Sequence, residues 1–336
     1  MHELCAGREN GGKPFIDVKG LVKHYPLKAG LFSTKAEKVH AVNGVSLSIE
    51  RGKTHGLVGE SGSGKTTTAR LLLRVMEPDA GEFSFGDTQN VFTLEPGELK
   101  KIRRRMQYIF QDPYASLNPK MQVRDIVTEP LRYREAFPRG RGAGEEVSLI
   151  AGRLLERVGL SARDVRKYPH EFSGGQRQRL CIARALAGKP EFIVCDEPVS
   201  SLDVSIQSQI LNLLLDIQKE EEISCLFIAH NLAVVFYLSD YVSVMYAGRI
   251  VEASPSRVLA AHARHPYTRL LLEAMPGGAK KEGSRASDSG ETPSLIHLPR
   301  GCAFSSRCPL KKPACAETSP PLVEKEPGRF LACFEA

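Results

Sequence analysis

The sequence lacks the features that mark a membrane-spanning or secreted protein. None of its apolar runs approaches the roughly 18–20 residues that a membrane helix needs. The N-terminal stretch Met1–Asn10 carries acidic side chains and no apolar core, so it does not resemble a secretory signal. We therefore expect a cytosolic chain.

A dense run of Lys and Arg with interleaved aromatic residues, which would indicate a nucleic-acid groove, is also missing. The net charge of +7 comes from 46 basic and 39 acidic residues spread along the chain, and we interpret these charges as solvated surface. With 336 residues, 42% of them apolar, the chain can build about two domains with full cores. The composition predicts a globular protein with no nucleic-acid partner.

The segment Gly59–Thr67 reads G-E-S-G-S-G-K-T-T and fits the phosphate-loop pattern G-x-x-x-x-G-K-[ST]. Before it, the apolar segment Thr54–Val58 predicts a buried strand, and after it the spacing of apolar side chains in Thr66–Met76 predicts a helix. In such a loop, backbone N–H groups surround the phosphates, the Lys contacts the β- and γ-phosphates, and the next hydroxyl binds Mg²⁺. The candidate nucleotide-binding residues of the loop are Gly59, Ser61, Gly62, Ser63, Gly64, Lys65, Thr66 and Thr67.

Other strands are predicted on both sides of this loop. Phe15–Tyr25 and Val39–Ile49 alternate apolar and polar residues and predict antiparallel strands. Phe192–Asp196 and Ser224–Ala229 are continuous apolar runs on either side of a helical pattern, as a parallel strand–helix–strand unit requires. Shorter strands are expected at Gly81–Gly86 and Met106–Phe110, and a hairpin at Tyr241–Ala253 that turns at Ala247 and Gly248.

Helices are predicted between these strands from apolar spacing. Val123–Arg134 and Glu145–Leu160 are separated by a turn at Pro138–Gly144 and indicate an inserted helical subdomain. The remaining predicted helices are Gly97–Arg105, Ser205–Glu220 and Pro255–Met275. The composition of Pro276–Pro293 predicts a disordered linker.

Two adjacent acids, Asp196 and Glu197, stand at the end of the apolar strand Phe192–Asp196. Removing an unpaired charge from water costs several kcal/mol, so acids at this position indicate a function. Asp196 fits a ligand for Mg²⁺, and Glu197 fits a base that activates water. His230 ends the next strand, where it could contact the γ-phosphate or the attacking water. The alternative for His230 is an ordinary surface or core histidine.

The segment Phe172–Gln176 reads F-S-G-G-Q and is followed by R-Q-R-L-C-I-A-R-A-L, which resembles the signature sequence of ABC-type ATPases. The resemblance continues in order along the chain, with Gln111 at the Q-loop, Asp203 in the D-loop segment Ser201-Leu202-Asp203, and His230 at the switch histidine. It implies that Gln111, Lys65, Glu197 and His230 act in catalysis. It also implies that Thr66, Gln111 and Asp196 hold Mg²⁺ and that Tyr25 stacks on adenine. The remaining implied nucleotide contacts are Gln111, Asp196, Ser173, Gly174, Gly175, Gln176 and Asp203.

The fold implied by this resemblance is an α/β phosphate-loop NTPase of the ABC-ATPase type, with a mixed sheet, an antiparallel β subdomain and an inserted helical subdomain. We place the ATPase domain at residues 13–254 and its helical subdomain at about 112–185. A helix and linker follow at 255–293, and a small Cys-rich lobe at 294–336 closes the chain.

Three segments of the chain resemble the ATPases of oligopeptide/dipeptide importers. They read Y-P-H-E-F-S-G-G-Q-R-Q-R, F-I-V-C-D-E-P-V-S-S-L-D-V-S-I-Q and H-P-Y-T-R-L-L-L-E-A-M-P. Ser201 and Asn231 depart from the family's usual Ala and Asp without removing a required group. The resemblance implies ATP and Mg²⁺ as ligands, a sister ATPase subunit in a heterodimer, two membrane permeases and a periplasmic or lipid-anchored solute-binding protein. It places the chain at the cytoplasmic face of the cell membrane.

The cargo is left open by the sequence. Di- or oligopeptides, nickel and glutathione are all carried by importers with this ATPase wording, and we favour peptides on the resemblance alone. A different class, the soluble ABC ATPases that act on DNA or ribosomes, is the alternative, although those chains usually carry coiled-coil insertions or two ATPase cores.

The tail carries four of the eight cysteines, spaced Cys302-x5-Cys308-x6-Cys315-x17-Cys333. Zinc ribbons place ligands in closer pairs, whereas iron–sulfur spacing is more varied and often includes Cys-Pro, as in Cys308-Pro309. The peptide-importer family is similar in binding a [4Fe–4S] cluster here; zinc and unliganded thiols are the alternatives. Because the linker separates the tail from the phosphate loop, we expect a structural cluster that staples the tail. Three of the other cysteines, Cys181, Cys195 and Cys225, are expected to be buried thiols, and Cys5 lies in the N-terminal stretch.

Overall fold

The computed structural model describes residues 13–27, 37–133, 137–138, 143–275 and 293–335. Contacts divide the chain into two compact units: Met1–Leu94 with Phe227–Ala336 form the first unit, and Glu95–Leu226 form the second. The predicted linker lies outside the described residues except for Pro293, and Cys5 and most of the predicted turn at Pro138–Gly144 lie outside them too.

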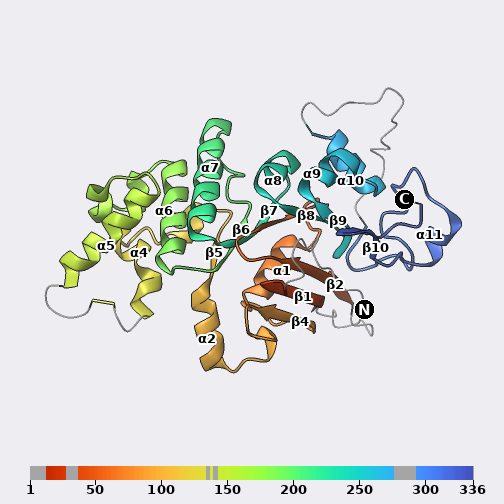
Figure 1. Cartoon of the computed structure of the whole chain (residues 1–336), viewed down its shortest axis with the longest axis horizontal. Coiled ribbons are helices and arrows are strands. Elements are labelled where there is room, and N and C mark those ends of the chain that lie inside the picture. Colours follow the sequence, from red (N-terminus) through yellow and green to blue (C-terminus); the bar gives the residue numbers. More distant parts are fainter. Residues whose placement is uncertain (1–12, 28–36, 134–136, 139–142, 276–292, 336) are drawn as a thin grey trace. The chain divides into compact units, whose positions relative to one another are not determined.

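An antiparallel sheet in the first unit has the strand order β2-β1-β4. Its strands are β1 (Ile16–Pro26), β2 (Lys38–Ile49) and β4 (Ala80–Phe85), and they lie side by side in Figure 1. Alternating apolar side chains fill one face, because period-two patterning puts every second residue on the same side; Ile16, for example, is fully buried opposite both Ile49 and Phe85. The two strands predicted before the phosphate loop are confirmed.

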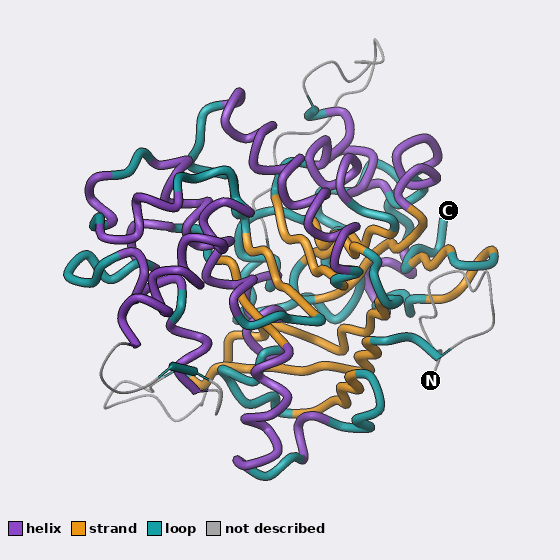
Figure 2. Tube along the Cα trace, turned by 60° about the vertical axis from the view of Figure 1, so that its left-hand side comes forward, coloured by secondary structure: helices purple, strands orange, loops and turns teal. Residues whose placement is uncertain are grey.

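A mixed sheet in the first unit contains the strand that leads into the phosphate loop. Within this unit the strands run in the order β10-β11-β9-β8-β3, and Figure 2 colours the strands orange and the helices purple. Their bounds are β3 (Thr54–Val58), β8 (Tyr241–Tyr246), β9 (Arg249–Pro255), β10 (Val323–Glu326) and β11 (Arg329–Leu331). β3 pairs with β8 in parallel, and the other three pairs are antiparallel.

The predicted hairpin at Tyr241–Ala253 is confirmed as β8 and β9, with the turn at Ala247 and Gly248, which both have positive φ. The C-terminal tail belongs to the same sheet: Phe330 and Leu331 pair with Ala253 and Glu252 of β9. The expectation of a separate Cys-rich lobe is therefore not supported, because backbone hydrogen bonds make the tail an extension of the first unit's sheet.

The helices of the first unit are shorter than the sequence suggested. They are α1 (Lys65–Leu72), η1 (Val91–Thr93), α8 (Leu232–Leu238), α9 (Ser256–His262), α10 (Pro266–Glu273) and α11 (Pro313–Glu317). The single helix predicted over Pro255–Met275 is wrong, because it breaks into α9 and α10. Pro266 disfavours helical geometry at His265, which instead caps α10 by accepting a hydrogen bond from the Tyr267 N–H through Nδ1.

The second unit carries most of the helices. They are α2 (Pro96–Arg105), α3 (Pro113–Ser116), α4 (Val123–Val127), η2 (Glu129–Tyr133), α5 (Ala143–Arg157), η3 (Ala162–Arg166), η4 (Pro169–Glu171), α6 (Gly174–Ala187) and α7 (Val204–Glu221). The predicted helix Val123–Arg134 is only partly right: α4 ends at Val127, because Pro130 has no N–H to donate to Ile126 and the chain tightens into η2.

Two parallel strands support these helices. β5 (Met106–Ile109) pairs with β6 (Phe192–Asp196), with Met106 opposite Phe192. β7 (Ser224–Ala229) crosses the boundary between the units, and the N–H of its first residue donates to Glu191 O, just before β6. All five residues of β6 are buried, as expected for a continuous apolar run in a parallel sheet. Among the described residues, no helix is long and apolar enough to cross a membrane.

Candidate functional site

The phosphate loop joins a buried strand to a helix, as the motif predicted. β3 ends at Val58, and α1 begins at Lys65. The Lys65 side chain is buried, and its Nζ donates to Gly59 O at 2.8 Å and to Glu60 O at 2.9 Å. The ammonium group therefore lies inside the curve of the loop, next to the backbone that the motif assigns to the phosphates.

Two glycines are required by how closely the loop packs. Gly59 and Gly64 have φ of 154° and 105°, a region that L side chains rarely adopt. A Cβ at Gly59 would lie 2.1 Å from Met245 O, and a Cβ at Gly64 would lie 2.3 Å from Ala41 O. The loop therefore presses against β8 on one side and β2 on the other, and only glycine fits at either position.

The second residue of the loop, Glu60, is held by the C-terminal tail. Its carboxylate accepts two hydrogen bonds from the Arg307 guanidinium, both at 2.9 Å. Its backbone N–H donates to the Tyr267 hydroxyl of α10 at 2.8 Å. The prediction that the tail is separated from the phosphate loop is wrong in this respect, because the linker separates the two only along the sequence.

The other predicted site residues of the first unit are Tyr25 and His230. Tyr25 lies near the end of β1, half-buried, with its hydroxyl 3.5 Å from the Met76 sulfur and Lys23 Nζ 5.9 Å from its ring centroid. His230 is exposed immediately after β7. The next residue, Asn231, caps α8 by accepting a hydrogen bond from the Ala233 N–H, so the departure from Asp retains a helix cap.

In the second unit, the acidic pair lies at the end of β6. Asp196 is 4% exposed, and its Oδ2 accepts a hydrogen bond from the Tyr108 hydroxyl of β5 at 2.5 Å. Glu197 follows with a φ of 47°, a left-handed conformation that costs energy for a residue other than glycine. Gln111 Nε2 donates to Glu197 Oε2 at 3.1 Å. The structure therefore brings together Gln111, Asp196 and Glu197, three of the residues that the motifs singled out.

The signature residues form the N-terminus of α6. Ser173 is the N-cap, with Oγ accepting from the Gln176 N–H at 3.3 Å, and Gln176 Oε1 accepts in return from the Ser173 N–H at 3.0 Å. This capping box leaves Ser173 exposed at a helix N-terminus, where the dipole favours an anion. Gly175 packs against α7: a Cβ there would lie 2.5 Å from Ile206 Cγ2. Asp203, the D-loop residue, is exposed at the N-cap of α7.

The four tail cysteines, Cys302, Cys308, Cys315 and Cys333, line one small pocket together with His265 and Phe304. Burial raises the pKa of the Cys302 and Cys308 thiols, so both are protonated at neutral pH unless a cation stabilises the thiolate. Among the described residues, no group of three or more His, Cys, Asp or Glu side chains is placed so that it could hold a metal ion. The geometry therefore does not support the predicted iron–sulfur cluster or zinc site.

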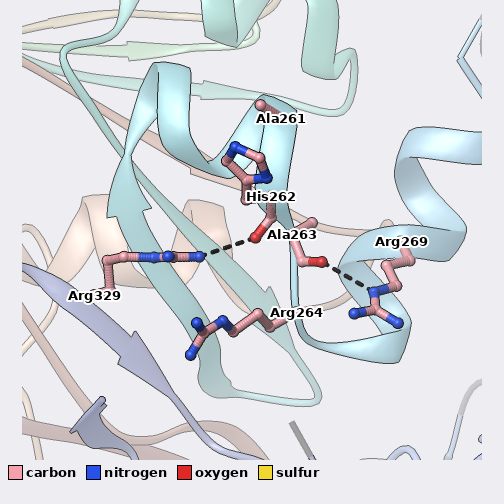
Figure 3. Close-up of a pocket in the computed structure, with 6 residues that line it drawn as sticks. All are labelled: Ala261, His262, Ala263, Arg264, Arg269 and Arg329. Atoms are coloured by element: carbon pink, nitrogen blue, oxygen red, sulfur yellow. Dashed lines mark hydrogen bonds between the residues drawn. The ribbon is translucent and has the colours of Figure 1, made fainter. Parts of the chain in front are cut away.

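A separate basic pocket of about 560 Å³ lies where α9 turns into α10 (Figure 3). Arg329 of β11 donates to His262 O at 3.0 Å, and Arg269 donates to Ala263 O at 2.9 Å. Glu326 accepts hydrogen bonds from both Arg329 and Arg264. These contacts give the arginines a role within the fold, because they fasten the C-terminal hairpin to the corner between the two helices.

Sequence reasoning missed Glu60 itself and three residues that hold the site: one contacts the predicted Asp196, and two contact Glu60. Tyr108 holds Asp196, and Arg307 and Tyr267 hold Glu60. Tyr108 lies on β5, which pairs with β6 and comes just before Gln111 in the sequence, so its place beside the acidic pair follows from the pairing of these two strands. The two contacts to Glu60 join residues more than 200 positions apart, and no local pattern indicates them.

Two family profiles match the chain. The profile described as ABC transporter matches residues 42–200, and the profile described as oligopeptide/dipeptide transporter, C-terminal region, matches residues 251–315. The first match covers the phosphate loop, the signature and the acidic pair, and the second covers α10, Arg307 and three of the tail cysteines.

Curated relatives match over nearly the whole chain. A Brucella ovis protein named as a peptide import ATP-binding protein is 48% identical over 96% of this chain and 98% of its own length. The oligopeptide transport ATP-binding protein AppF of Bacillus subtilis is 44% identical over 95% of this chain and 96% of its own length. A solved dimeric ATP-binding cassette in a post-hydrolysis state, bound to ADP and Pi, is 30% identical, with a TM-score of 0.62 over 72% of this chain and 99% of that one.

Proposed function

This chain belongs to the ATP-binding proteins of the oligopeptide/dipeptide ABC transporter family, and from that premise we propose how its residues bind and hydrolyse ATP. It is the ATP-binding subunit of a peptide importer, an ABC-type ATPase whose hydrolysis is coupled to transport. The alternative of a soluble ABC ATPase acting on DNA or ribosomes finds no support. The relatives that match this chain over almost their full length are named for peptide import or oligopeptide transport.

ATP binding is proposed for the phosphate loop, whose shape fits the triphosphate. The positive φ angles of Gly59, Gly62 and Gly64 curve the backbone of the loop, as a cradle for phosphate oxygens requires. Lys65 is proposed to turn its ammonium from the loop carbonyls to the β- and γ-phosphates, and Tyr25 to stack on adenine. The loop contacts are proposed for Ser61, Gly62, Ser63, Thr66 and Thr67.

Hydrolysis is proposed to depend on the acidic pair at the end of β6. When bound, Mg²⁺ neutralises charge on the β- and γ-phosphates, and Thr66, Gln111 and Asp196 are the residues proposed to hold it. Glu197 is proposed as the base that accepts a proton from the attacking water, and His230 as a contact of the γ-phosphate. The observation that carries this proposal is the left-handed backbone of Glu197, because such strain persists where a side chain must be aimed.

The signature residues are proposed to act on the nucleotide of a second ATPase subunit. Ser173, Gly174, Gly175 and Gln176 present a capped helix N-terminus with no phosphate loop in the same unit, and Asp203 is exposed at the start of the next helix. The solved relative that binds ADP and Pi is dimeric. We extend this arrangement to a heterodimer with a sister ATPase, two membrane permeases and a solute-binding protein, with the chain at the cytoplasmic face of the cell membrane.

The cargo and the tail metal are finer proposals. Di- or oligopeptides are favoured over nickel and glutathione by the names of the relatives. A [4Fe–4S] cluster at Cys302, Cys308, Cys315 and Cys333 is proposed from the cysteine spacing alone, with zinc as the alternative. Iron, acid-labile sulfide and zinc measured on anaerobically purified protein would decide between them, and a protein without metal would refute both.

The experiment that tests the function is Glu197→Gln, which removes the base and keeps the shape of the side chain. ATP hydrolysis should fall by at least about a hundredfold, the usual contribution of a positioned general base, while ATP still binds and holds two ATPase subunits together. Glu220→Gln, on the exposed face of α7, is the matched control and should hydrolyse ATP normally. Turnover by Glu197→Gln close to that of the control would remove Glu197 from the role of base.

A further inference from the structure

The contact between Arg307 and Glu60 joins the Cys-rich tail to the nucleotide site. The pair is bidentate, with two N–O distances of 2.9 Å, and the side chains are only 12% and 27% exposed. A parallel pair of hydrogen bonds fixes orientation as well as distance, and partial burial reduces screening by solvent. The contact is therefore more specific than an ordinary surface ion pair.

Aromatic side chains hold the Arg307 guanidinium in place. Its Cζ lies 5.7 Å from the centre of the Phe304 ring and 6.0 Å from that of Tyr246, within the range of cation–π attraction. Phe304 is itself buried against Tyr246 and Tyr267, with ring centroids 5.4 and 5.5 Å apart. Because these rings come from the tail, β8 and α10, they fix Arg307 relative to the strand beside the phosphate loop.

Glu60 connects Arg307 to Lys65, the lysine proposed to bind phosphate. The Glu60 carboxylate is held by Arg307, its N–H by the Tyr267 hydroxyl, and its carbonyl accepts a hydrogen bond from Lys65 Nζ at 2.9 Å. Three groups of one residue thus have partners in the tail, in α10 and in the loop itself. A displacement of Glu60 would change the path of the loop at the residue next to Gly59.

The segment that carries Arg307 is built around the cysteines. Cys302 N–H donates to Cys315 O at 2.8 Å, and Arg307 N–H donates to Phe304 O at 3.0 Å. A Cβ at Gly301 would lie 2.2 Å from Cys315 O, so the backbone at Gly301 packs against α11 without spare room. Because Arg307 directly precedes Cys308, a shift in the position of the thiols would also shift the Arg307 guanidinium.

We infer that Arg307 and Tyr267 are positioning residues of the phosphate loop, through which the Cys-rich tail sets the affinity of the site for nucleotide. Neither side chain is assigned a contact with ATP; both act through Glu60. The inference rests on the proposed binding of ATP by the loop.

The test compares Arg307→Gln, Glu60→Gln and the double variant with Arg300→Gln, an exposed arginine in the same tail. We would measure the dissociation constant of a fluorescent ATP analogue, together with kcat and KM for hydrolysis by the assembled transporter. Arg307→Gln and Glu60→Gln should each weaken nucleotide binding by about tenfold, as expected for residues in one network, and raise KM more than they lower kcat. Tyr267→Phe should weaken binding less, and Arg300→Gln should bind like the wild type.

The double variant gives the decisive comparison. If the two side chains act through their contact, Arg307→Gln with Glu60→Gln should lose no more affinity than either single change. Equal affinity of Arg307→Gln and wild type, or losses that add in full, would overturn the inference. A wild-type protein that does not bind the nucleotide would instead refute the proposed function. If Arg307→Gln does not fold, Glu60→Gln and Tyr267→Phe still test the contact from the loop and α10 sides.

Discussion

Lowering the pH should destabilise the first unit through His55, a fully buried histidine on β3. Its Nδ1 lies 3.0 Å from Ser48 O and its Nε2 2.9 Å from Ser243 Oγ. Burial lowers the pKa of His55 from 6.5 to about 4, and the hydrogen bond to Ser48 O offsets only part of that effect. The folded protein therefore disfavours the protonated imidazole.

The sign and size follow from the two pKa values. Because the folded pKa lies below the unfolded value of 6.5, the unfolded chain binds the proton first. The stability from neutral His55 is complete above about pH 6.5 and is lost as the pH falls toward about 4. Each pKa unit corresponds to about 1.4 kcal/mol, so between pH 7.5 and pH 5 the loss should be about 2 kcal/mol.

The measurement is urea unfolding of the wild type and of His55→Gln at pH 7.5 and pH 5. Glutamine does not titrate, so the wild type should lose about 2 kcal/mol more than the variant over this interval, whatever other groups contribute to both. The difference between the two proteins isolates His55. Equal losses in the two proteins would show that His55 has a normal pKa in the folded state and refute the reasoning.

Two further predictions concern packing and the tail. Gly175→Ala would place a Cβ 2.5 Å from Ile206 Cγ2 and should lower the free energy of unfolding by about 1–3 kcal/mol through overpacking. Thermal unfolding should show this loss. The control is Gly97→Ala, where a Cβ meets no atom within 4 Å, and it should be neutral or stabilising. A fall in stability no larger than that of Gly97→Ala would contradict it. Cys308→Ser should abolish any bound iron measured in the wild type, while Cys225→Ser on β7 keeps it; iron retained by Cys308→Ser would exclude Cys308 as a ligand.

The strands and the loop were predictable because their signals are local. The motif of the phosphate loop, the apolar run of β6 and the turn at Ala247 and Gly248 each depend on residues close in sequence. The capping box of Ser173 and Gln176 is also a local signal, but it was not predicted from the sequence. These elements could be placed to within one or two residues of their observed bounds.

Helix lengths were less predictable because proline overrode apolar spacing. The patterns around Val123–Arg134 and Pro255–Met275 continue through Pro130 and Pro266, and the periodicity of apolar residues does not register the missing N–H. After Val127 the chain changes to the tighter helix η2, and at Pro266 it starts the new helix α10. At these two positions proline, and not the apolar periodicity, determines where the helix ends.

The contact of Glu60 with Arg307 shows a third limit, because it depends on two distant segments meeting through the fold. The motif fixes the glycines and the lysine of the loop but leaves Glu60 free, since any residue fits the x positions of the pattern. The pairing of β11 with β9 and the packing of Phe304 on Tyr246 bring the tail to the loop. A residue that the motif leaves unspecified can thus carry the link between the nucleotide site and a segment 247 positions away.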